Sequence, residues 1–230
     1  MKTLAVVGVL ILALVTSALA GDVTGKIAFK GKAPEMARIR MDADRYCRSA
    51  HRTAVTSEEV VVNKNGTLKN VLVYVKEGLA GKKFEAPAKT AIFDQLGCMY
   101  DPHVFAVQVG QKVEILNSDN TLHNVHTLST KNQAFNAGQP IKGAKLFKTF
   151  DKPELFHVKC DVHSWMSAYF GVFDNPYFAV TGDDGTFTIK GLPAGEYTVE
   201  AWHEKYGTQT MKVTVGASGS KTADFSFSGN

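Results

Sequence analysis

Residues 155–166 read Leu-Phe-His-Val-Lys-Cys-Asp-Val-His-Ser-Trp-Met, in which largely alternating apolar and polar residues lead into a short polar stretch. The alternation is typical of a half-buried β-strand over Leu155–Cys160. Two residues separate Cys160 from His163, and two more separate His163 from Met166. A short loop between two strands can fold three side chains at this spacing back toward one point. The sequence therefore predicts a β-hairpin whose loop gathers a thiol, an imidazole and a thioether.

A second imidazole is available upstream, in the segment 117–124 that contains His123. With Cys160, His163 and Met166, this histidine completes a set of one thiolate, two imidazoles and one thioether. Such a set is typical of a mononuclear copper site with three ligands near a plane and a long axial bond to methionine sulfur. Zinc sites use Cys and His without Met, and iron–sulfur clusters need more thiolates. The sequence thus predicts one copper ion as the cofactor.

Two other histidines compete for a role at a metal. His126 lies three residues after His123, so in a strand it faces the opposite side of the sheet, and we expect only one of the two to reach the copper. The alternation alone does not decide between them; the family resemblance of the pair His123-Asn124, given below, favours His123, and His126 is the alternative or an accessory ligand. His103, near Cys98, gives a weaker candidate for a second site, because a single histidine beside a turn is more often structural.

The rest of the chain is dominated by β signals. Short runs rich in β-branched and aromatic residues are separated by clusters of Gly, Asp and Asn. No long segment has helical periodicity, and Met36–Arg52 is the best candidate for a short helix or an irregular crossover. Many short strands with regular turns predict an all-β protein built from sandwiches. The strand runs are Thr24–Phe29, Val71–Val75, Val104–Val109, Lys112–Leu116, Leu155–Cys160, Thr186–Ile189, Tyr197–Trp202 and Met211–Val215, and the core is assigned to Phe105, Phe147, Phe150, Phe156 and Phe170.

The central part of the chain resembles the cupredoxins, small copper proteins of the plastocyanin and amicyanin type. Val104–Asn117 resembles their two strands joined by a Gly turn and ending in Asn. The triplet 123–125 is similar to their first ligand with its Asn, and Phe150–Val172 resembles their closing hairpin. The loop holds Ser164-Trp165 rather than a Pro, so the face that docks a partner is not predicted.

The resemblance implies a Greek-key copper domain and a role for each residue at the metal. Cys160 is the strong thiolate ligand, His123 and His163 complete the plane, and Met166 is the weak axial ligand. His163 is also the expected electron exit, beside Trp165 and Val162. Asn117 and Asn124 are expected to orient the ligands without binding the metal themselves, by holding the ligand-bearing segments in place.

The flanking parts resemble another family. Gly21–Ile27 and Thr181–Tyr197 resemble the carboxypeptidase regulatory-like, or transthyretin-like, β-sandwich of immunoglobulin-like architecture. Gly81–Ala88 has the composition of a linker, and a second boundary falls at Asp174–Pro176. Because domain termini lie close together, such a sandwich tolerates an inserted domain. The arrangement is similar to exported methylamine-utilisation or plastocyanin-like proteins, and it predicts residues 21–86 with 176–230 as a discontinuous outer sandwich and 87–175 as the copper domain.

The N-terminus predicts export. Lys2 precedes a twelve-residue apolar run, Leu4–Val15, and Ser17–Ala20 has the small residues of a cleavage site. The run is shorter than the roughly 20 residues that a membrane-spanning helix needs. We therefore expect residues 1–20 to be a cleaved signal peptide, the protein to be periplasmic or secreted, and the mature chain to have no transmembrane span.

The three cysteines and the net charge of the chain give two further predictions. If Cys160 holds a metal in an oxidising compartment, Cys47 and Cys98 can pair in a disulfide, the alternative being two buried free thiols. The formal net charge is +4, of which one positive charge lies in the predicted signal. This excess is interpreted as spread along the chain without a basic run, which gives no case for nucleic acid.

The predicted function is one-electron transfer between redox partners in the periplasm, not enzymatic catalysis. The four-ligand set leaves no evident open position for a substrate, and neither a hydrolytic triad nor a phosphate-binding Gly loop is present. Two alternatives belong to other classes. One is a protein that stores or delivers copper, and the other is an envelope binding module in which the copper is structural.

Overall fold

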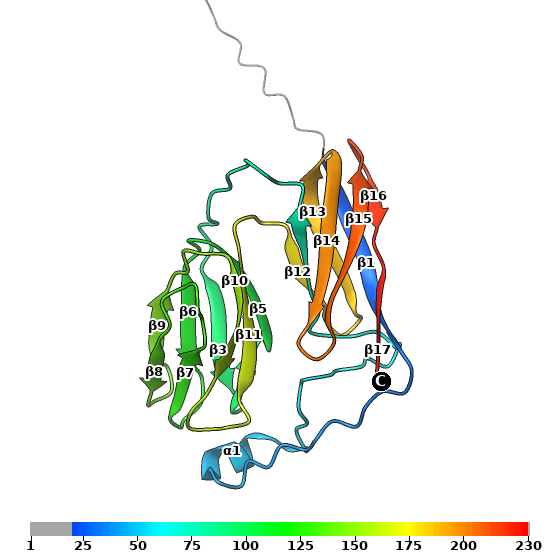
Figure 1. Cartoon of the computed structure of the whole chain (residues 1–230). Helices are drawn as coiled ribbons and strands as arrows, with labels where there is room; N and C mark the ends of the chain where they lie inside the picture. Colours follow the sequence, from blue (N-terminus) through cyan, green and yellow to red (C-terminus); the bar gives the residue numbers. More distant parts are fainter. Residues whose placement is uncertain (1–19, 230) are drawn as a thin grey trace, which may run out of the picture.

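The computed structural model describes residues 20–229, and the regular secondary structure of these residues is almost entirely β-strand (Figure 1). The predicted signal peptide lies outside the described residues except for Ala20, where strand β1 begins. Within 20–229 there is one short α-helix, α1 (Arg45–Ala50), and no helix long and apolar enough to cross a membrane. The all-β class predicted from the strand runs is therefore confirmed.

Strands from the middle of the chain form two sheets, here called the inner pair. The predicted hairpin is present: β10 and β11 run antiparallel from Glu154 opposite Val172 to Lys159 opposite Ser167. Strand β5 lies parallel to β11, and β7 lies on the other side of β10. In order, one sheet is β5 (Val104–Gln108), β11 (Ser167–Phe173), β10 (Glu154–Lys159), β7 (His123–Thr127) and β8 (Asn136–Gln139), and the other is β4 (Met99–Asp101), β3 (Ala91–Leu96), β6 (Val113–Asn117) and β9 (Lys145–Lys148).

Strands from both ends of the described chain form two further sheets, here called the outer pair. Strand β1 pairs with β13 and with β17 from the C-terminal part. Strand β2 likewise lies between β12 and β14. Segments before and after the inner pair in sequence thus share the same sheets. The first sheet contains β1 (Ala20–Lys30), β13 (Thr186–Pro193), β16 (Ser220–Thr222) and β17 (Phe225–Ser228), and the second contains β2 (Leu72–Glu77), β12 (Phe178–Val180), β14 (Gly195–His203) and β15 (Gly207–Val215).

Aromatic side chains fill the inner pair. Phe170 of β11 is fully buried, and its ring packs edge-on against Phe93 of β3 with centroids 4.6 Å apart. Phe105, Phe150 and Phe156 also belong to this core. The core assignment of Phe147 is wrong: the residue is 47 % exposed on β9, where the ammonium of Lys112 lies 4.1 Å from its ring centroid.

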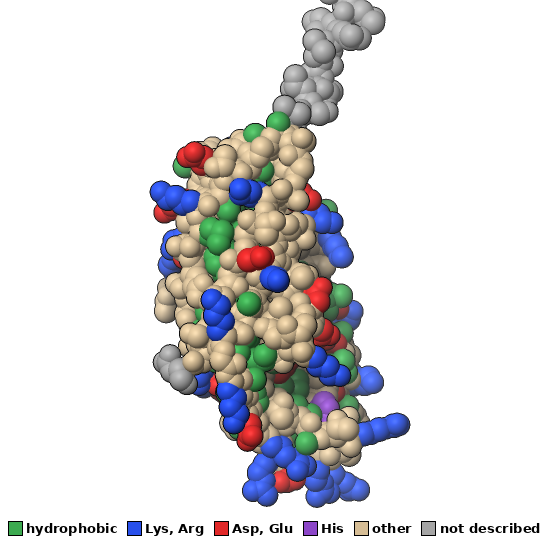
Figure 2. Space-filling view, turned by 90° about the vertical axis from the view of Figure 1, so that its right-hand side faces the viewer, with side chains coloured by type: hydrophobic (Ala, Val, Ile, Leu, Met, Phe, Trp, Pro, Cys, Tyr) green, Lys and Arg blue, Asp and Glu red, His purple; other side chains and the backbone are tan. Residues whose placement is uncertain are grey.

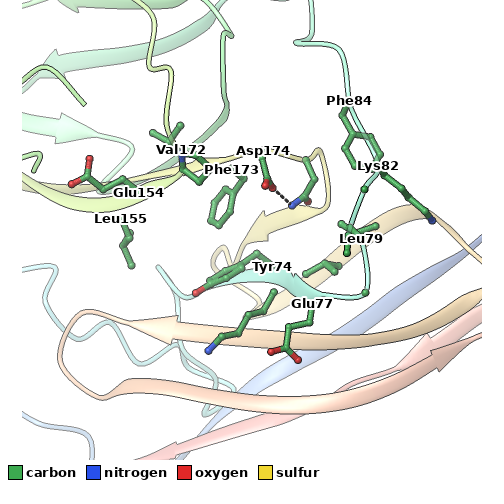
Figure 3. Close-up of a pocket in the computed structure, with 17 residues that line it drawn as sticks. Tyr74, Glu77, Leu79, Lys82, Phe84, Glu154, Leu155, Val172, Phe173 and Asp174 are labelled. Atoms are coloured by element: carbon green, nitrogen blue, oxygen red, sulfur yellow. Dashed lines mark hydrogen bonds between the residues drawn. The ribbon is translucent and has the colours of Figure 1, made fainter. Parts of the chain in front are cut away.

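The inner and outer pairs pack directly on each other (Figure 3). Tyr74 of β2 faces Phe173 of β11, with ring centroids 4.7 Å apart. Strand β11 approaches β2 closely at Gly171, where a Cβ would lie 2.7 Å from Leu72 Cδ2. Beside this contact lies a groove of about 560 Å³, lined from the outer pair by residues 74–82 and from the inner pair by residues that include Glu154. The junction therefore holds a cavity, but none of the predicted copper ligands lines it.

The segment between β1 and β2 is mostly irregular and reaches the far end of the inner pair, where Figure 1 shows α1. Of the predicted helix or crossover at Met36–Arg52, only Arg45–Ala50 is helical. Asp44 caps this helix by accepting a 2.9 Å hydrogen bond from the backbone N–H of Cys47. A helix of six residues is too short to be stable alone, so tertiary contacts must hold this segment.

The carboxylate of Glu154 organises the loop that follows β7, and this gives a pH-dependent contribution to stability. It accepts hydrogen bonds from the hydroxyl of Ser129 at 2.5 Å and from the backbone N–H groups of Thr130 and Asn132 at 2.6 and 3.1 Å. Partial burial raises the pKa of Glu154, but these hydrogen bonds outweigh it and lower the pKa to about 2. Because the unfolded chain titrates near 4.5, the contribution is complete above that pH and is lost as pH falls toward 2.

We expect Glu154→Gln to lower the free energy of unfolding by about 1 kcal/mol at pH 7, and the difference from wild type to shrink below pH 4. Urea unfolding at pH 7, 4.5 and 3 measures this. Glu35→Gln, at an exposed position outside the sheets, is the control and should not change the pH profile. An equal loss for Glu154→Gln at all three pH values would show that its carboxylate charge is irrelevant.

Candidate metal centre

The loop between β10 and β11 folds back on itself around Cys160. The backbone N–H of Cys160 donates to the carbonyl of Met166 at 3.2 Å, and that of Met166 donates to the carbonyl of His163 at 3.0 Å. The backbone N–H of His163 lies 3.4 Å from Cys160 Sγ. The two-residue spacings therefore produce a closed, hydrogen-bonded loop, which fixes the positions of its side chains.

His123 meets this loop from the neighbouring strand. It is the first residue of β7, which pairs with β10 just before Cys160. Its Nδ1 lies 3.0 Å from Nδ1 of His163, and ligand atoms of His123, Cys160 and His163 all lie within 4.8 Å of one another. The three residues are at most 3 % exposed. The structure thus brings together three of the four predicted ligands in one buried cluster.

Met166 closes the same loop, and its side chain is fully buried in the core that also contains Cys160. Its backbone is tied to both Cys160 and His163 by the hydrogen bonds described above. The position suits a residue that approaches the cluster from the core side. The axial bond from its sulfur stays a prediction.

The outer nitrogens of both histidines have partners, so each ring is fixed in orientation. His123 Nε2 lies 2.9 Å from Oδ2 of Asp119, a fully buried carboxylate. His163 Nε2 lies 3.3 Å from Oδ2 of Asp44 and 3.7 Å from Sγ of Cys47. Both Nδ1 atoms consequently point inward, toward each other. A second partner of this kind is what orients ligand histidines at metal sites.

The surroundings favour the charge states that a metal site needs at Cys160, His163 and Asp119. Burial raises the pKa of Cys160, but hydrogen bonds from His123 and from backbone N–H groups outweigh it, so the thiol pKa is lowered. Burial lowers the pKa of His163 and keeps its imidazole neutral. Burial also raises the pKa of Asp119, but the hydrogen bonds from His123, Cys98 and Gly97 outweigh this effect. The pKa of Asp119 is therefore lowered overall, which keeps this carboxylate ionised. At His123, burial lowers the pKa, but the hydrogen bonds to Asp119 and Cys160 outweigh it and raise the pKa, so a metal ion would have to displace a proton there.

The two predicted supporting asparagines connect the segments that carry the ligands. Asn124 Oδ1 accepts a 2.6 Å hydrogen bond from the backbone N–H of Asp161, which ties β7 to the Cys160 loop. Asn117 Nδ2 donates to the carbonyls of Thr121 and Gln139, both at 2.9 Å. Asn117 Oδ1 also accepts the backbone N–H of Asp119 at 2.9 Å. These contacts fix the loop that presents Asp119 and His123.

The competing histidines lie away from the cluster. His126 Nδ1 contacts Oδ2 of Asp161 at 2.9 Å, and its side chain is 30 % exposed. His103 lies against the carbonyl of Ser167 at 2.9 Å and the carboxylate of Glu204. Among the described residues, neither belongs to a group with metal-ligand spacing.

The predicted disulfide between Cys47 and Cys98 is present and lies beside the cluster. Two further groups have metal-ligand spacing, one formed by Asp44, Cys47 and His163 and the other containing Cys98 with Asp119 and His123. Both depend on a sulfur that the disulfide already uses. Cys160 is accordingly the free cysteine of the chain and the one available as a thiolate.

The donor set fits copper. A thiolate and two inward imidazole nitrogens suit both oxidation states of the ion, and a buried thioether is a soft neighbour that excludes hard cations. Residues with this role would be Cys160, His123 and His163, with Met166 as the axial candidate.

The carboxylates at the centre were not predicted from the sequence. Asp119 lies in the quoted segment 117–124, four residues before His123, and that spacing was the available signal. It accepts hydrogen bonds from the backbone N–H groups of Gly97 and Cys98 at 2.8 and 2.6 Å and from the hydroxyl of Tyr46 at 3.1 Å. Asp44 lies more than a hundred residues from His163 in sequence and gave no signal at all.

We expect Asp119→Asn to weaken copper binding by about ten- to a hundredfold, because the amide holds His123 less firmly than the carboxylate does. Competition with a chromophoric chelator measures the affinity. Asp94→Asn is the control, since its carboxylate contacts Ser118 rather than a histidine. An affinity unchanged in Asp119→Asn would show that His123 needs no such support.

Comparisons with known proteins give one family match and several structural similarities of low score. Residues 174–228 match the carboxypeptidase regulatory-like domain family, and among curated proteins no sequence matches this chain. Solved structures are also similar to the chain, among them the following three. The Cu-containing nitrite reductase from Thermus scotoductus SA-01 is 22 % identical over 42 % of this chain and 25 % of its own, with a TM-score of 0.36.

The other two are smaller. A purple cupredoxin from Nitrosopumilus maritimus is 19 % identical over 36 % of this chain and 98 % of its own, with a TM-score of 0.32. The reduced Cu(I) form of an amicyanin mutant at pH 4 is 20 % identical over 44 % of this chain and 97 % of its own, with a TM-score of 0.33. This chain thus spans a quarter of the nitrite reductase, and at these TM-scores the chemistry of the centre rests on the chain's own residues.

Proposed function

We propose that this protein is an exported carrier of single electrons that holds one copper ion at His123, Cys160, His163 and Met166. The observation that carries the proposal is the buried cluster of one thiol and two imidazoles with ligand atoms within 4.8 Å of one another. Bound copper would supply the one-electron couple. In this proposal residues 87–175 form the copper domain, and residues 21–86 with 176–230 form the outer sandwich.

The chain's own contribution is a rigid, dry site. The loop hydrogen bonds fix Cys160 and Met166, and Asp119 and Asp44 fix the two imidazoles. Donors held in this way keep their positions when an electron arrives or leaves, so little reorganisation opposes the transfer. Because the ligands are at most 3 % exposed, water and substrates are kept from the centre, which favours outer-sphere exchange over catalysis.

Burial also favours a carrier over a storage or delivery protein, because a delivered ion must pass to another protein through an accessible ligand. Protein-film voltammetry on the copper-loaded protein tests the choice. We expect a reversible one-electron couple and copper that is retained for hours against a Cu(I) chelator. An irreversible response with rapid loss of Cu(I) to the chelator would replace this proposal with delivery.

The periplasmic or secreted location follows from the predicted signal peptide, and the presence of a disulfide agrees with an oxidising compartment. The redox partner would be another protein there. Fractionation of the native organism's cells tests the location, with processed protein expected outside the cytoplasm.

A further inference from the structure

The outer edge of the His163 ring, which carries Nε2, is covered by another segment of the chain and does not face solvent. Its Nε2 contacts Asp44 and Cys47, and the residue is 3 % exposed. The covering segment is α1 with the residue before it, fastened to the inner pair by the Cys47–Cys98 disulfide. Trp165 supports the other side, with its ring 4.9 Å from that of His163 and its Nε1 donating to the carbonyl of Cys98 at 2.9 Å. His163 therefore does not reach the surface itself, and the electron exit through it stays a prediction that must pass through the covering residues.

Every arginine of the chain lies in this covering segment or in the residues on either side of it. The five residues are Arg38, Arg40, Arg45, Arg48 and Arg52, and all five are exposed. With the two aspartates between them, residues 38–52 have a formal charge of +3, most of the +4 of the whole chain. The interpretation of the positive excess as evenly spread is thus wrong, because the lysines alone are spread. Figure 2 shows blue side chains gathered at the lower end of the molecule, where Figure 1 places α1.

These arginines are largely free to bind a partner. Within residues 20–229, one of them forms an ion pair, Arg40 with Asp42 at 3.6 Å, and both side chains are more than two-thirds exposed. A solvated pair of this kind contributes little. The natural ligand of a planar guanidinium is a carboxylate, which it can bind through two parallel hydrogen bonds.

A groove leads from this surface toward the metal centre. It has a volume of about 490 Å³ and is lined by four of the arginines, by His51 and by Cys47. Asp42 is the one acidic residue in its lining. Cys47 also forms the contact to His163, with Sγ 3.7 Å from Nε2. The groove therefore brings a bound partner to within one residue of a predicted copper ligand.

We propose that this arginine groove, formed by residues 38–55, docks a redox protein with an acidic face, and that electrons cross between that protein and the centre at Cys47 and His163. The inference rests on the proposed function. One electron moves in each exchange, so the centre is oxidised as the partner is reduced or the reverse, and no bond is made or broken. A nucleic acid or an anionic membrane would also bind arginines, but neither accounts for a groove whose lining includes Cys47, the residue in contact with His163.

The test measures docking separately from electron transfer. The probe is a soluble c-type cytochrome with a pI below about 5, titrated at low ionic strength into the metal-free protein by isothermal calorimetry. The variant carries R38Q, R40Q, R45Q, R48Q and R52Q. The matched control removes five exposed lysines of the outer pair with K26Q, K30Q, K190Q, K212Q and K221Q, so both lose the same charge.

We expect the arginine variant to bind the cytochrome at least tenfold more weakly and with less salt dependence, because clustered charges steer association and distributed ones do not. The lysine variant should stay within twofold of wild type. In copper-loaded protein, electron exchange with the same cytochrome should slow at least tenfold in the arginine variant while its visible spectrum is unchanged.

Equal weakening in both variants, or none in the arginine variant, would overturn the inference. It would also be overturned if the arginine variant lost binding to vesicles of phosphatidylglycerol and phosphatidylcholine but bound the cytochrome as wild type does. Failure of the proposed function has a different signature: the metal-free binding result would stand, but the copper-loaded protein would show no reversible couple.

Discussion

Under the proposed function the Cu(II)-loaded protein has an intense visible absorption, and replacement of Cys160 by serine is expected to abolish it. That absorption arises from charge transfer between a thiolate and copper, and Cys160 is the one cysteine outside the disulfide. A serine hydroxyl is neither a soft donor nor ionised at neutral pH, so any bound copper would be held by imidazoles alone. The loss should be complete, and the reversible couple should disappear with it. Absorption spectra of wild type and Cys160→Ser after addition of one equivalent of Cu(II) measure this.

Two histidine variants serve as a matched pair for this experiment. His123→Gln should also lose the band or shift it strongly, because His123 Nδ1 points into the cluster. His126→Gln should retain it, because His126 contacts Asp161 on the other side of the strand. The reverse pattern, with the band lost in His126→Gln and kept in His123→Gln, would assign the ligand to His126.

Removal of the disulfide is expected to destabilise the protein by about 4 kcal/mol, within the usual 2–5 kcal/mol. The bond closes a loop with a sequence separation of 51 residues, so its loss frees much chain entropy in the unfolded state. Helix α1 is only six residues long and contains Cys47, so this bond ties it to the inner pair. Urea unfolding of the metal-free Cys47→Ser/Cys98→Ser double variant measures the change.

The same variant should also alter the centre, because Asp44 and Cys47 lie against His163. We expect His163 to become accessible to diethylpyrocarbonate in the double variant and to stay protected in the wild type. Wild type treated with a dithiol reductant is the control and should lose similar stability. A loss below about 1 kcal/mol, with His163 still protected, would show that packing alone holds the segment in place.

The ligand loop could be predicted because its information is local. Cys160, His163 and Met166 are so near in sequence that a short loop between two strands leaves few ways to arrange them. His123 needed one further step, the period of two that separates it from His126 along a strand. The central hairpin and the all-β class followed from the same alternation. Several strands, among them β8 and β9, were not predicted because they are four residues long and carry no clear pattern.

The cover over the centre could not be predicted, because it depends on contacts between distant residues. Asp44 and His163 are 119 residues apart, and Cys47 and His163 are 116 apart. Nothing in the irregular sequence around α1 indicates where this segment packs. The clustering of the arginines was visible in the sequence, but charge alone does not place a segment over a metal centre. The burial of Phe147 was also mispredicted, because an apolar residue on an edge strand such as β9 can face solvent.

The central claim is that one thiolate and two imidazoles bind a common copper ion, and copper K-edge X-ray absorption of the Cu(II)-loaded protein tests it most directly. The proposal predicts one short copper–sulfur distance and two copper–nitrogen distances per metal in the wild type, with the sulfur contribution absent in Cys160→Ser. A wild-type spectrum that shows only nitrogen and oxygen neighbours would contradict it.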